Sequence, residues 1–339
     1  LESFSDTLTH IKGVTPHLNS LKRQGLYFSR FYANSFRTDR GLLSVLMGYP
    51  APATVSLMKF PRKTATMPSL AAHLKRAGYD LNYYYGGDAD FTNMRSFLIN
   101  QGFEHITEDA DFPISERLSK WGVPDHLLFA KAKNDLTVQA KAGHLDINTR
   151  RPAFTVIQTS SSHEPFDVPY HRLSNPILNA FAYADASLGG FISYLKASGR
   201  WNQSLVIIVP DHLGAWPRNA DSFKTWRFHV PLIWTGGMIK RPEVVPVYGS
   251  QQDIAATVLG QLGINHSDMT FSKDLFSDAF HHAAYFMMND GFGLIDDDNE
   301  VIYDNKLQRV RIDTGRLRGK NIKNGKATVQ VLFDDIAGR

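Results

Sequence analysis

The sequence predicts an α/β fold with a doubly wound, mostly parallel sheet that is flanked by helices and followed by a small C-terminal antiparallel α+β subdomain. Short, continuous apolar runs are typical of strands that are buried on both faces of a parallel sheet. Segments with helical periodicity lie between these runs, as they do in doubly wound sheets. Near the C-terminus the pattern changes to short strand-like runs separated by Asn, Asp and Gly.

Apolar, often β-branched runs indicate the strands of the large sheet. They include "SLVIIVPDH", in which five apolar residues end at a polar pair. The opening "LESF" resembles the last residues of a further strand. The other strands are expected within residues 27–34, 153–162, 204–212 and 229–236.

Helical spacing of apolar residues and helix stop signals predict the helices between these strands. Gly25 and Gly78 follow two of the periodic segments and are plausible helix ends. Ser250 is expected to cap the start of another helix. The helices are expected within residues 15–25, 66–78, 180–199 and 250–263.

A composition change near residue 280 predicts a catalytic domain over residues 1–278 and a small subdomain over 279–339. Within the latter, residues 283–305 alternate strand-like runs with Asn, Asp and Gly turns. The segment "ATVQVLF" (327–333) is expected to add a final strand.

Composition excludes several classes of function. Of the 339 residues 43% are hydrophobic and 21% are charged, which is ordinary for a globular protein. The net charge of +4 is too small and too dispersed for a nucleic-acid-binding protein. The absence of cysteine excludes disulfides, thiolate metal sites and cysteine nucleophiles. No apolar run is long enough to span a bilayer, and the non-methionine start suggests a fragment of a longer protein.

Polar residues gather where the expected strands end, which is where open α/β sheets form their sites. They are Glu2, Thr38, His163, Asp211 and His212. Two carboxylates, imidazole and a hydroxyl suit a divalent ion such as Mn²⁺ or Zn²⁺, and coordination would activate the threonine hydroxyl. Each residue alone also fits an ordinary role as a cap, turn or surface residue, and spacing does not decide between these interpretations.

Ordered motifs over roughly residues 1–275 resemble the sulfatase-like branch of the alkaline phosphatase superfamily, and within it the lipoteichoic acid synthase and phosphoglycerol transferase family. The motifs are "LESF", "TPHLNSLKRQGLYFSRFYANSFRTDRG", "MPSLAAHLKRAGY", "SSSHEPF", "YADASLGGFISYL", "VIIVPDHLG", "HVPLIW" and "SQQDIAATVLGQLGI".

The resemblance implies a role for each candidate residue. It makes Thr38 the nucleophile, and Glu2, Thr38, Asp211 and His212 the ligands of one divalent ion, with Mn²⁺ favoured over Mg²⁺ or Zn²⁺. His163 would contact the substrate phosphate. Arg37, Arg40, Arg95 and His229 are further candidates for binding the anionic substrate, whereas Asp125 is expected to be structural.

The nucleophile position sets this chain apart from the sulfatases proper. Those enzymes carry Cys or Ser in a C/S-x-P-x-R motif, whereas this sequence has Thr38 in "RTDRG". The resemblance therefore implies a transferase that moves phosphoglycerol through a covalent phosphothreonine. Phosphoethanolamine transfer and hydrolysis of a phosphodiester or sulfate ester are the enzymatic alternatives, and a non-catalytic scaffold domain is another.

The resemblance also implies partners and a location. The donor would be a phospholipid such as phosphatidylglycerol, and the acceptor a hydroxyl of a glycan or a growing polymer. The catalytic domain would lie outside the cytoplasmic membrane, at the cell surface or in the periplasm, held by a membrane segment that is absent from this chain.

Overall fold

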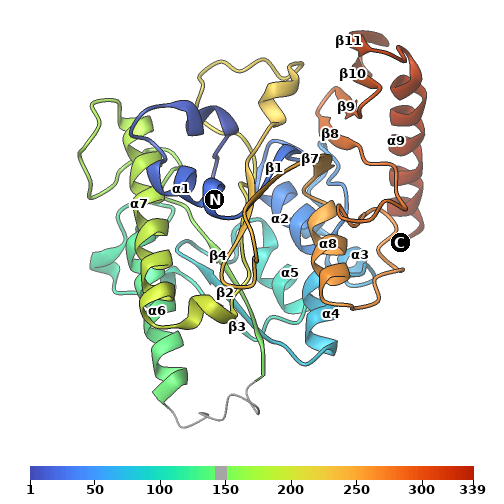
Figure 1. Cartoon of the computed structure of the whole chain (residues 1–339). Coiled ribbons are helices and arrows are strands. Elements are labelled where there is room, and N and C mark those ends of the chain that lie inside the picture. The colour runs from blue at the N-terminus through green and yellow to red at the C-terminus, as the bar shows by residue number, and fades with distance from the viewer. Residues whose placement is uncertain (142–150) are drawn as a thin grey trace.

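The computed structural model describes residues 1–141 and 151–339 (Figure 1). Strands lie between two layers of helices, and a separate sheet with one long helix stands at one end. The helices are α1 Pro16–Gln24, α2 Thr38–Met47, α3 Pro61–Thr64, α4 Leu70–Arg76, α5 Met94–Asn100, α6 Asp125–Lys141, α7 Pro176–Ala197, α8 Asp253–Gln261 and α9 Lys320–Gly338. The strands are β1 Leu26–Tyr32, β2 Asp80–Tyr85, β3 His105–Thr107, β4 Ala153–Gln158, β5 Val206–Ile208, β6 Leu232–Thr235, β7 Glu243–Ser250, β8 Ala284–Met288, β9 Gly291–Ile295, β10 Asn299–Asp304 and β11 Arg309–Gly315.

The strands of the large domain form two hydrogen-bonded groups. One has the order β5-β6-β1-β7, and the other has the order β3-β2-β4 with both pairs parallel. In the first group β1 and β7 are parallel, whereas β6 is antiparallel to both β5 and β1. The expectation of a mostly parallel sheet is therefore confirmed, with β6 as a reversed strand.

Helices cover both faces of the large sheet. Successive side chains of a strand point to opposite sides of the sheet, so apolar residues on both sides need a layer of helices to pack against. Leu232 and Trp234 of β6 belong to a core with α2, α4, α5 and α8. Ile233, between them, belongs to a second core with α1, α6 and α7. The doubly wound arrangement thus rests on two hydrophobic cores, one on each face.

Residues 1–4 lie between the two strand groups, but they do not form the strand that the sequence predicts. The Leu1 nitrogen donates to the Val209 carbonyl (2.8 Å), and the Asp211 nitrogen donates to the Leu1 carbonyl (3.1 Å). Ser3 then adopts a left-handed backbone conformation (φ +62°), which ends the extended path after Glu2. Glu2 is nevertheless placed at the end of β5.

The C-terminal region forms the expected antiparallel sheet, in the order β11-β10-β9-β8. The predicted strand at 327–333 is wrong, because these residues lie within α9. Helical spacing places Gly325 and Leu332 on the face of α9 that packs on the sheet, where a Cβ at Gly325 would lie 2.0 Å from the Phe292 ring. Packing of this face overrides the β-propensity of the two valines.

Four predicted helices are confirmed as α1, α4, α7 and α8, although one cap is wrong. The N-cap of α8 is Gln252, whereas Ser250 is the last residue of β7 and its hydroxyl accepts a hydrogen bond from the Tyr285 nitrogen (2.8 Å). In the described part of the chain, no helix combines the length and apolar character needed to cross a bilayer.

Candidate active site

The predicted site residues come from segments that follow β1, β4 and β5. Thr38 is the first residue of α2, Asp211 and His212 follow β5, and His163 follows β4. β5 runs in the same direction as β1, since both are antiparallel to β6. Their carboxyl ends therefore meet at one edge, and the first residues of the chain bring Glu2 to the same place.

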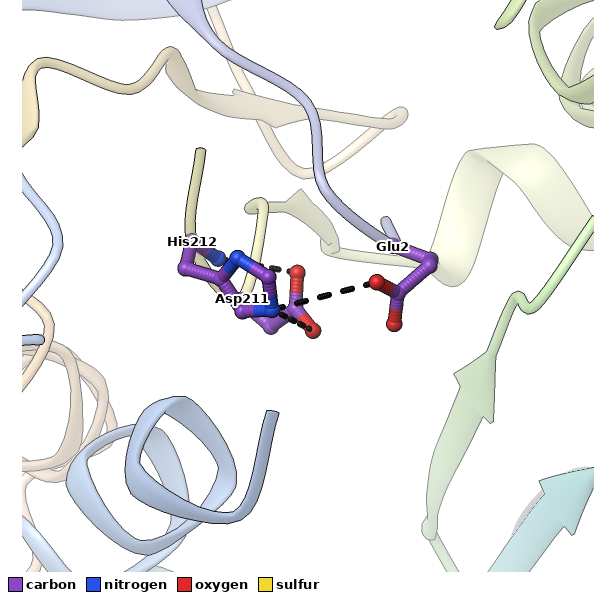
Figure 2. Close-up of side chains that lie close together, drawn as sticks. All are labelled: Glu2, Asp211 and His212. Carbon is purple, nitrogen blue, oxygen red and sulfur yellow. Dashed lines mark hydrogen bonds and ion pairs between the residues drawn. The ribbon is translucent and has the colours of Figure 1, made fainter. Parts of the chain in front are cut away.

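Glu2, Asp211 and His212 face one another closely (Figure 2). One ligand atom from each lies within 4.8 Å of the others. His212 Nε2 is 3.5 Å from Asp211 Oδ2 and 3.8 Å from Glu2 Oε1. This spacing suits three ligands around a shared cation.

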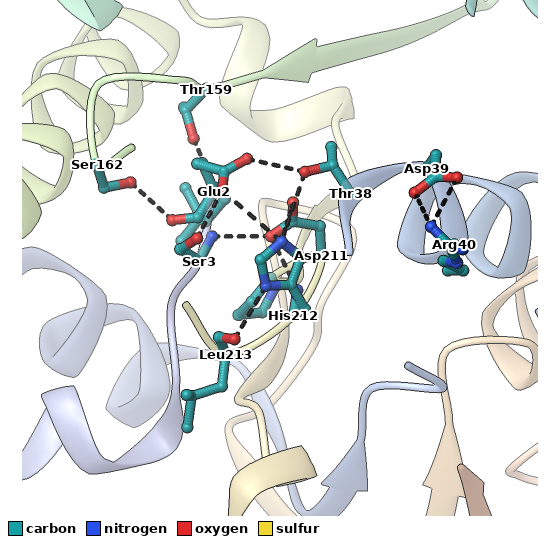
Figure 3. A network of polar contacts seen from close by, with 12 residues as sticks. Glu2, Ser3, Thr38, Asp39, Arg40, Thr159, Ser162, Asp211, His212 and Leu213 are labelled. Carbon is teal, nitrogen blue, oxygen red and sulfur yellow. Dashed lines mark hydrogen bonds and ion pairs between the residues drawn. The ribbon is translucent and has the colours of Figure 1, made fainter. Parts of the chain in front are cut away.

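The hydroxyl of Thr38 points into this group. Its Oγ1 donates to Glu2 Oε2 (3.3 Å) and lies 3.5 Å from His212 Nε2 (Figure 3). Thr38 is half-buried and begins α2, whose amino-terminal end carries partial positive charge. An anionic group bound at Thr38 would therefore be stabilised by the helix as well.

The hydrogen bonds around Glu2, Asp211 and His212 leave atoms available that could bind a cation. Asp211 Oδ1 accepts from the backbone nitrogens of Ser3 and His212, both at 2.8 Å. Asp211 Oδ2 is buried and has no hydrogen-bond partner among the residues that the structure describes. His212 Nδ1 donates to the Leu213 carbonyl (3.0 Å), so the neutral ring presents the Nε2 lone pair. These residues fit a divalent ion.

The electrostatics of the group also favour a cation. Burial and the neighbouring Asp211 charge raise the pKa of Glu2 well above its ordinary value. Two carboxylates this close repel each other unless positive charge lies between them. A divalent ion would reverse this effect and keep both carboxylates ionised.

Two glycines permit the close packing that assembles the site. A Cβ at Gly41, in the first turn of α2, would lie 2.4 Å from the Asp211 carbonyl oxygen. A Cβ at Gly214 would lie 2.1 Å from Ser3 Oγ. Real Cβ contacts are not this short, so any side chain would force the segments apart. Sequence reasoning gave no role to either glycine or to Ser3, although all three lie inside the motifs that it used.

His163 lies in the same region and packs at an angle of 42° against an aromatic ring. Its ring centroid is 4.0 Å from that of Trp121, and its Nδ1 donates to the Glu164 carbonyl (3.1 Å). Burial lowers the pKa of His163, and the nearby His212 acts in the same direction. A cavity of about 550 Å³ adjoins this loop and is lined by residues 118–120 and 164–167.

The candidate arginines near Thr38 differ in their contacts. Arg40 donates to both Asp39 oxygens (2.8 and 3.1 Å) and to the Ala53 carbonyl (3.1 Å), and Figure 3 shows this pair apart from Glu2, Asp211 and His212. Arg37 is exposed and immediately precedes Thr38. Of the two, Arg37 is therefore better placed to meet an incoming anion.

Arg95 and His229 are held by acidic neighbours. Arg95 pairs with Asp90 (2.8 Å) and Glu108 (2.5 Å). His229 Nδ1 lies 3.6 Å from Asp6, and its Nε2 donates to the Ser29 carbonyl (3.0 Å). Direct substrate contact by either residue stays a prediction, and each would have to exchange existing partners to make it.

Asp125 has the contacts of a structural residue. It is fully buried at the start of α6, and its Oδ1 accepts from the backbone nitrogens of Ser160 (2.9 Å) and Ser161 (3.1 Å). The segment that it holds continues to Ser162, whose hydroxyl donates to the Glu2 carbonyl (2.6 Å). These bonds place the loop that carries His163.

The fold and the site define an enzyme of the alkaline phosphatase superfamily. The sequence matches the Sulfatase family over residues 1–264, so the chain belongs to the sulfatase family. Enzymes of this superfamily generally use a divalent metal ion.

Relatives with similar sequences carry more specific names. Phosphoglycerol transferase I of Xanthomonas campestris is 25% identical over 287 residues, which cover 78% of this chain and 39% of the relative. Lipoteichoic acid synthase of Staphylococcus aureus is 27% identical over 324 residues, which cover 86% of this chain and 48% of the relative. The chain thus spans less than half the length of either.

Solved structures support the same fold. An alkaline phosphatase superfamily protein from Vibrio parahaemolyticus superposes with a TM-score of 0.85 at 25% identity, over 99% of this chain and 85% of that one. The lipoteichoic acid synthase LtaP of Listeria monocytogenes superposes with a TM-score of 0.81 at 21% identity, over 100% and 90% of the two chains.

Proposed function

We propose that this domain is a metal-dependent transferase that moves phosphoglycerol from a phospholipid headgroup to an acceptor hydroxyl through a phosphothreonine at Thr38. The observation that carries the proposal is the position of Thr38 Oγ1, 3.3 Å from Glu2 Oε2 and 3.5 Å from His212 Nε2 at the amino end of α2. The names of the phosphoglycerol transferase and lipoteichoic acid synthase relatives support the transferred group.

In the first step Thr38 Oγ1 attacks the phosphorus of the donor phosphodiester. The Oγ1–P bond forms as the P–O bond to diacylglycerol breaks. Glu2 Oε2 already accepts the threonine proton in a hydrogen bond, so it is the first acceptor for that proton. The departing diacylglycerol oxygen takes up that proton, so the step leaves Glu2 ionised and releases neutral diacylglycerol.

Glu2, Asp211 and His212, together with the Thr38 hydroxyl beside them, would hold the divalent ion, with Mn²⁺ favoured. When bound, the ion supplies positive charge that lowers the pKa of the threonine hydroxyl and offsets charge on the phosphoryl oxygens. The backbone nitrogens of Ser3 and His212 fix the Asp211 carboxylate, and the Leu213 carbonyl fixes the His212 ring. The chain thereby orients each ligand in advance.

In the second step an acceptor hydroxyl attacks the phosphothreonine. A new P–O bond forms, the Oγ1–P bond breaks, and the acceptor proton is balanced by reprotonation of Thr38. His163 supports this step, because its Nδ1 donates to the Glu164 carbonyl and its lowered pKa leaves a neutral Nε2 that can take a proton.

The donor is proposed to be an anionic phospholipid such as phosphatidylglycerol, and the acceptor a glycan or polymer hydroxyl. We place the domain outside the cytoplasmic membrane, attached through a segment that is not in this chain. The names of the lipoteichoic acid synthase relatives support this assignment.

Mass spectrometry of the domain after incubation with Mn²⁺ and phospholipid vesicles tests the proposal. With phosphatidylglycerol we expect a phosphoglycerol adduct on the peptide that contains Thr38. Thr38→Ala should lose the adduct and turnover while keeping its thermal stability. Thr66→Ala, which changes an exposed threonine, is the matched control.

The alternatives give different results. A phosphoethanolamine adduct formed from phosphatidylethanolamine would identify a phosphoethanolamine transferase. Release of free glycerol phosphate with no transfer to any hydroxyl acceptor would identify a hydrolase. Full activity in Thr38→Ala would refute the covalent mechanism, and full activity after chelation would refute the metal dependence.

A further inference from the structure

The fully buried carboxamide of Gln251 bonds to two backbone segments of the site, the one that carries Asp211 and the one that leads to Thr38. Gln251 follows β7 and is 0% exposed. Its Nε2 donates to the carbonyl oxygens of Pro210 and Asp211, both at 2.7 Å. Its Oε1 accepts from the backbone nitrogen of Asn34 (2.9 Å). One side chain therefore binds both the segment that carries Asp211 and the segment that leads to Thr38.

Asn34 extends these contacts to the C-terminal sheet. It lies four residues before Thr38, and its Nδ2 donates to the Tyr285 carbonyl of β8 (2.9 Å). Its own carbonyl accepts from the Met287 nitrogen of the same strand (2.8 Å). Gln252 completes the arrangement, because its nitrogen donates to Asn34 Oδ1 (2.9 Å) and its Oε1 accepts from Asn34 Nδ2.

Asp211 is held from two sides. Gln251 Nε2 binds its carbonyl oxygen, and the Cβ position of Gly41 in α2 lies 2.4 Å from the same oxygen. Because Gly41 and Thr38 share the first turn of α2, the helix that carries the nucleophile rests directly on the backbone of a cation ligand. A shift of either segment would change the separation of Thr38 Oγ1 from the cation-binding group.

We propose that Gln251 is a positioning residue, which sets the distance between Thr38 and Asp211 and, with Asn34, couples this distance to β8. The assignment of Thr38 and Asp211 to the reaction rests on the proposed function. Gln251 touches no cation-binding atom, so it acts through the two backbone segments. Its three bonds use both amide protons and the oxygen, so loss of the carboxamide leaves three buried backbone groups unpaired.

The test compares Gln251→Met, which keeps the shape of the side chain but removes all three bonds, with the wild-type chain. Titration calorimetry with Mn²⁺ should show about tenfold weaker binding, within the range for groups that orient metal ligands. The kcat for transfer should fall by roughly ten- to a hundredfold, while KM for the phospholipid stays unchanged, because the geometry of the reacting groups is altered and substrate contacts are not.

Asn299→Leu is the matched control. Asn299 is a buried carboxamide in β10 that also donates twice, to Asp313 Oδ1 and the Thr314 carbonyl (both 2.8 Å), and accepts once, from the Asn321 nitrogen (2.9 Å). Its replacement should lower the thermal stability without changing Mn²⁺ affinity or kcat. The proposal would be overturned if Gln251→Met and Asn299→Leu lost the same thermal stability and also lost Mn²⁺ affinity and kcat to the same extent.

Hydrogen exchange of the wild-type chain gives a readout that does not need a variant. Mn²⁺ should slow exchange of the Met287 amide, which donates to Asn34, and leave the β10–β11 amides unchanged. An unchanged Met287 amide would overturn the coupling to β8, even if Gln251→Met fails to fold.

The proposed function can fail separately. A wild-type chain that binds Mn²⁺ tightly but transfers nothing would refute the transferase, and the Mn²⁺ affinity of Gln251→Met would still decide the positioning role. A wild-type chain that transfers phosphoglycerol while Gln251→Met matches it in affinity and kcat would refute the positioning role alone.

Discussion

The two carboxylate oxygens of Asp211 differ in their hydrogen bonds. Oδ1 accepts from the backbone nitrogens of Ser3 and His212, whereas Oδ2 is buried without a partner in the part of the chain that the structure describes. An amide at this position would have to turn its oxygen toward the two N–H groups. Its NH₂ would then replace Oδ2 and point at the proposed cation position.

This geometry predicts the effect of Asp211→Asn. Mn²⁺ binding should weaken by at least roughly a hundredfold, since a charged ligand is exchanged for an amide donor. Transfer should fall to background. Calorimetry with Mn²⁺ and the transfer assay measure both effects, with Asp39→Asn as a control at a buried carboxylate that pairs with Arg40. Unchanged affinity would show that Asp211 is not a ligand.

Gly41→Ala should separate Thr38, the proposed nucleophile, from Glu2 and His212. The added Cβ would meet the Asp211 carbonyl oxygen at 2.4 Å, so α2 must move and take Thr38 with it. A displacement of this kind should lower kcat by about a hundredfold. The transfer assay measures the loss.

Gly190→Ala is the control, because among the described residues a Cβ there meets only Lys133 Nζ, at 3.8 Å. This exposed position in α7 should tolerate alanine with no loss of stability. Equal kcat in the Gly41 and Gly190 variants would mean that α2 adapts without moving Thr38.

At the scale of elements, α8 begins on a buried carboxyl. Asp253 Oδ2 accepts from the Ser250 nitrogen (2.9 Å) and Oδ1 accepts from the Lys273 nitrogen (3.1 Å). Burial raises the pKa of Asp253 from 3.8 to about 7. The folded chain therefore retains a proton at pH 4 to 7 that the unfolded chain releases.

The sign of this shift predicts a pH dependence of stability. The contribution of protonated Asp253 to the free energy of unfolding is complete below pH 3.8 and is lost as pH rises through 7. Over this range the free energy of unfolding falls by up to about 1.4 kcal/mol per pH unit. Urea unfolding between pH 5 and 8 should show this slope in the wild type and its loss in Asp253→Asn. The exposed Asp221→Asn should keep it, and a slope that survives in Asp253→Asn would assign it to another group.

The elements also show where sequence reasoning works. Apolar runs correctly located β1, β4 and β5, because burial on both faces leaves a strong signal, although the expected ranges extend two to four residues past the observed strand ends. The prediction for segment 327–333 was wrong. Its alternating valines are typical of a strand, but the packing of Gly325 and Leu332 against the C-terminal sheet favours a helix. That contact is long-range and has no local signature.

At the scale of the whole molecule, one hydrophobic core crosses the expected boundary at 278/279. Phe28 and Leu259 of the large domain belong to the same buried cluster as Met287, Phe292 and Leu332. β8 also contacts β1 and β7. The division into two domains stays a prediction. The two parts contribute side chains to one common hydrophobic core.

A fragment of residues 1–278 should therefore be much less stable than the full chain. Each large apolar side chain removed from the core costs about 1.5–3 kcal/mol, and several are lost from a total of about 5–15 kcal/mol. Circular dichroism melts of the fragment and the full chain measure the difference. A fragment that melts at the temperature of the full chain would establish 1–278 as an independent domain.

The whole fold decides which of the candidate residues come into contact with one another. Spacing and the family resemblance named Glu2, Thr38, Asp211 and His212, which the structure brings together. The same reasoning could not foresee that Arg40 pairs with Asp39 or that His229 lies beside Asp6, because partners follow from packing. The sequence places Gln251 at the start of an expected helix, and nothing in it shows that this side chain bonds to the segments around Asn34 and Asp211.

The hydrogen bond between Ser3 and Asp211 links positions 208 residues apart in the sequence. An unfolded chain cannot keep such distant groups together, so the residues proposed to bind a divalent ion come together only in the native state. Free ion and folding are then thermodynamically linked, and ion at a hundredfold excess over its Kd would add about 2.7 kcal/mol to the free energy of unfolding. The ion concentration around the protein would thus regulate how long the enzyme survives as well as how fast it works.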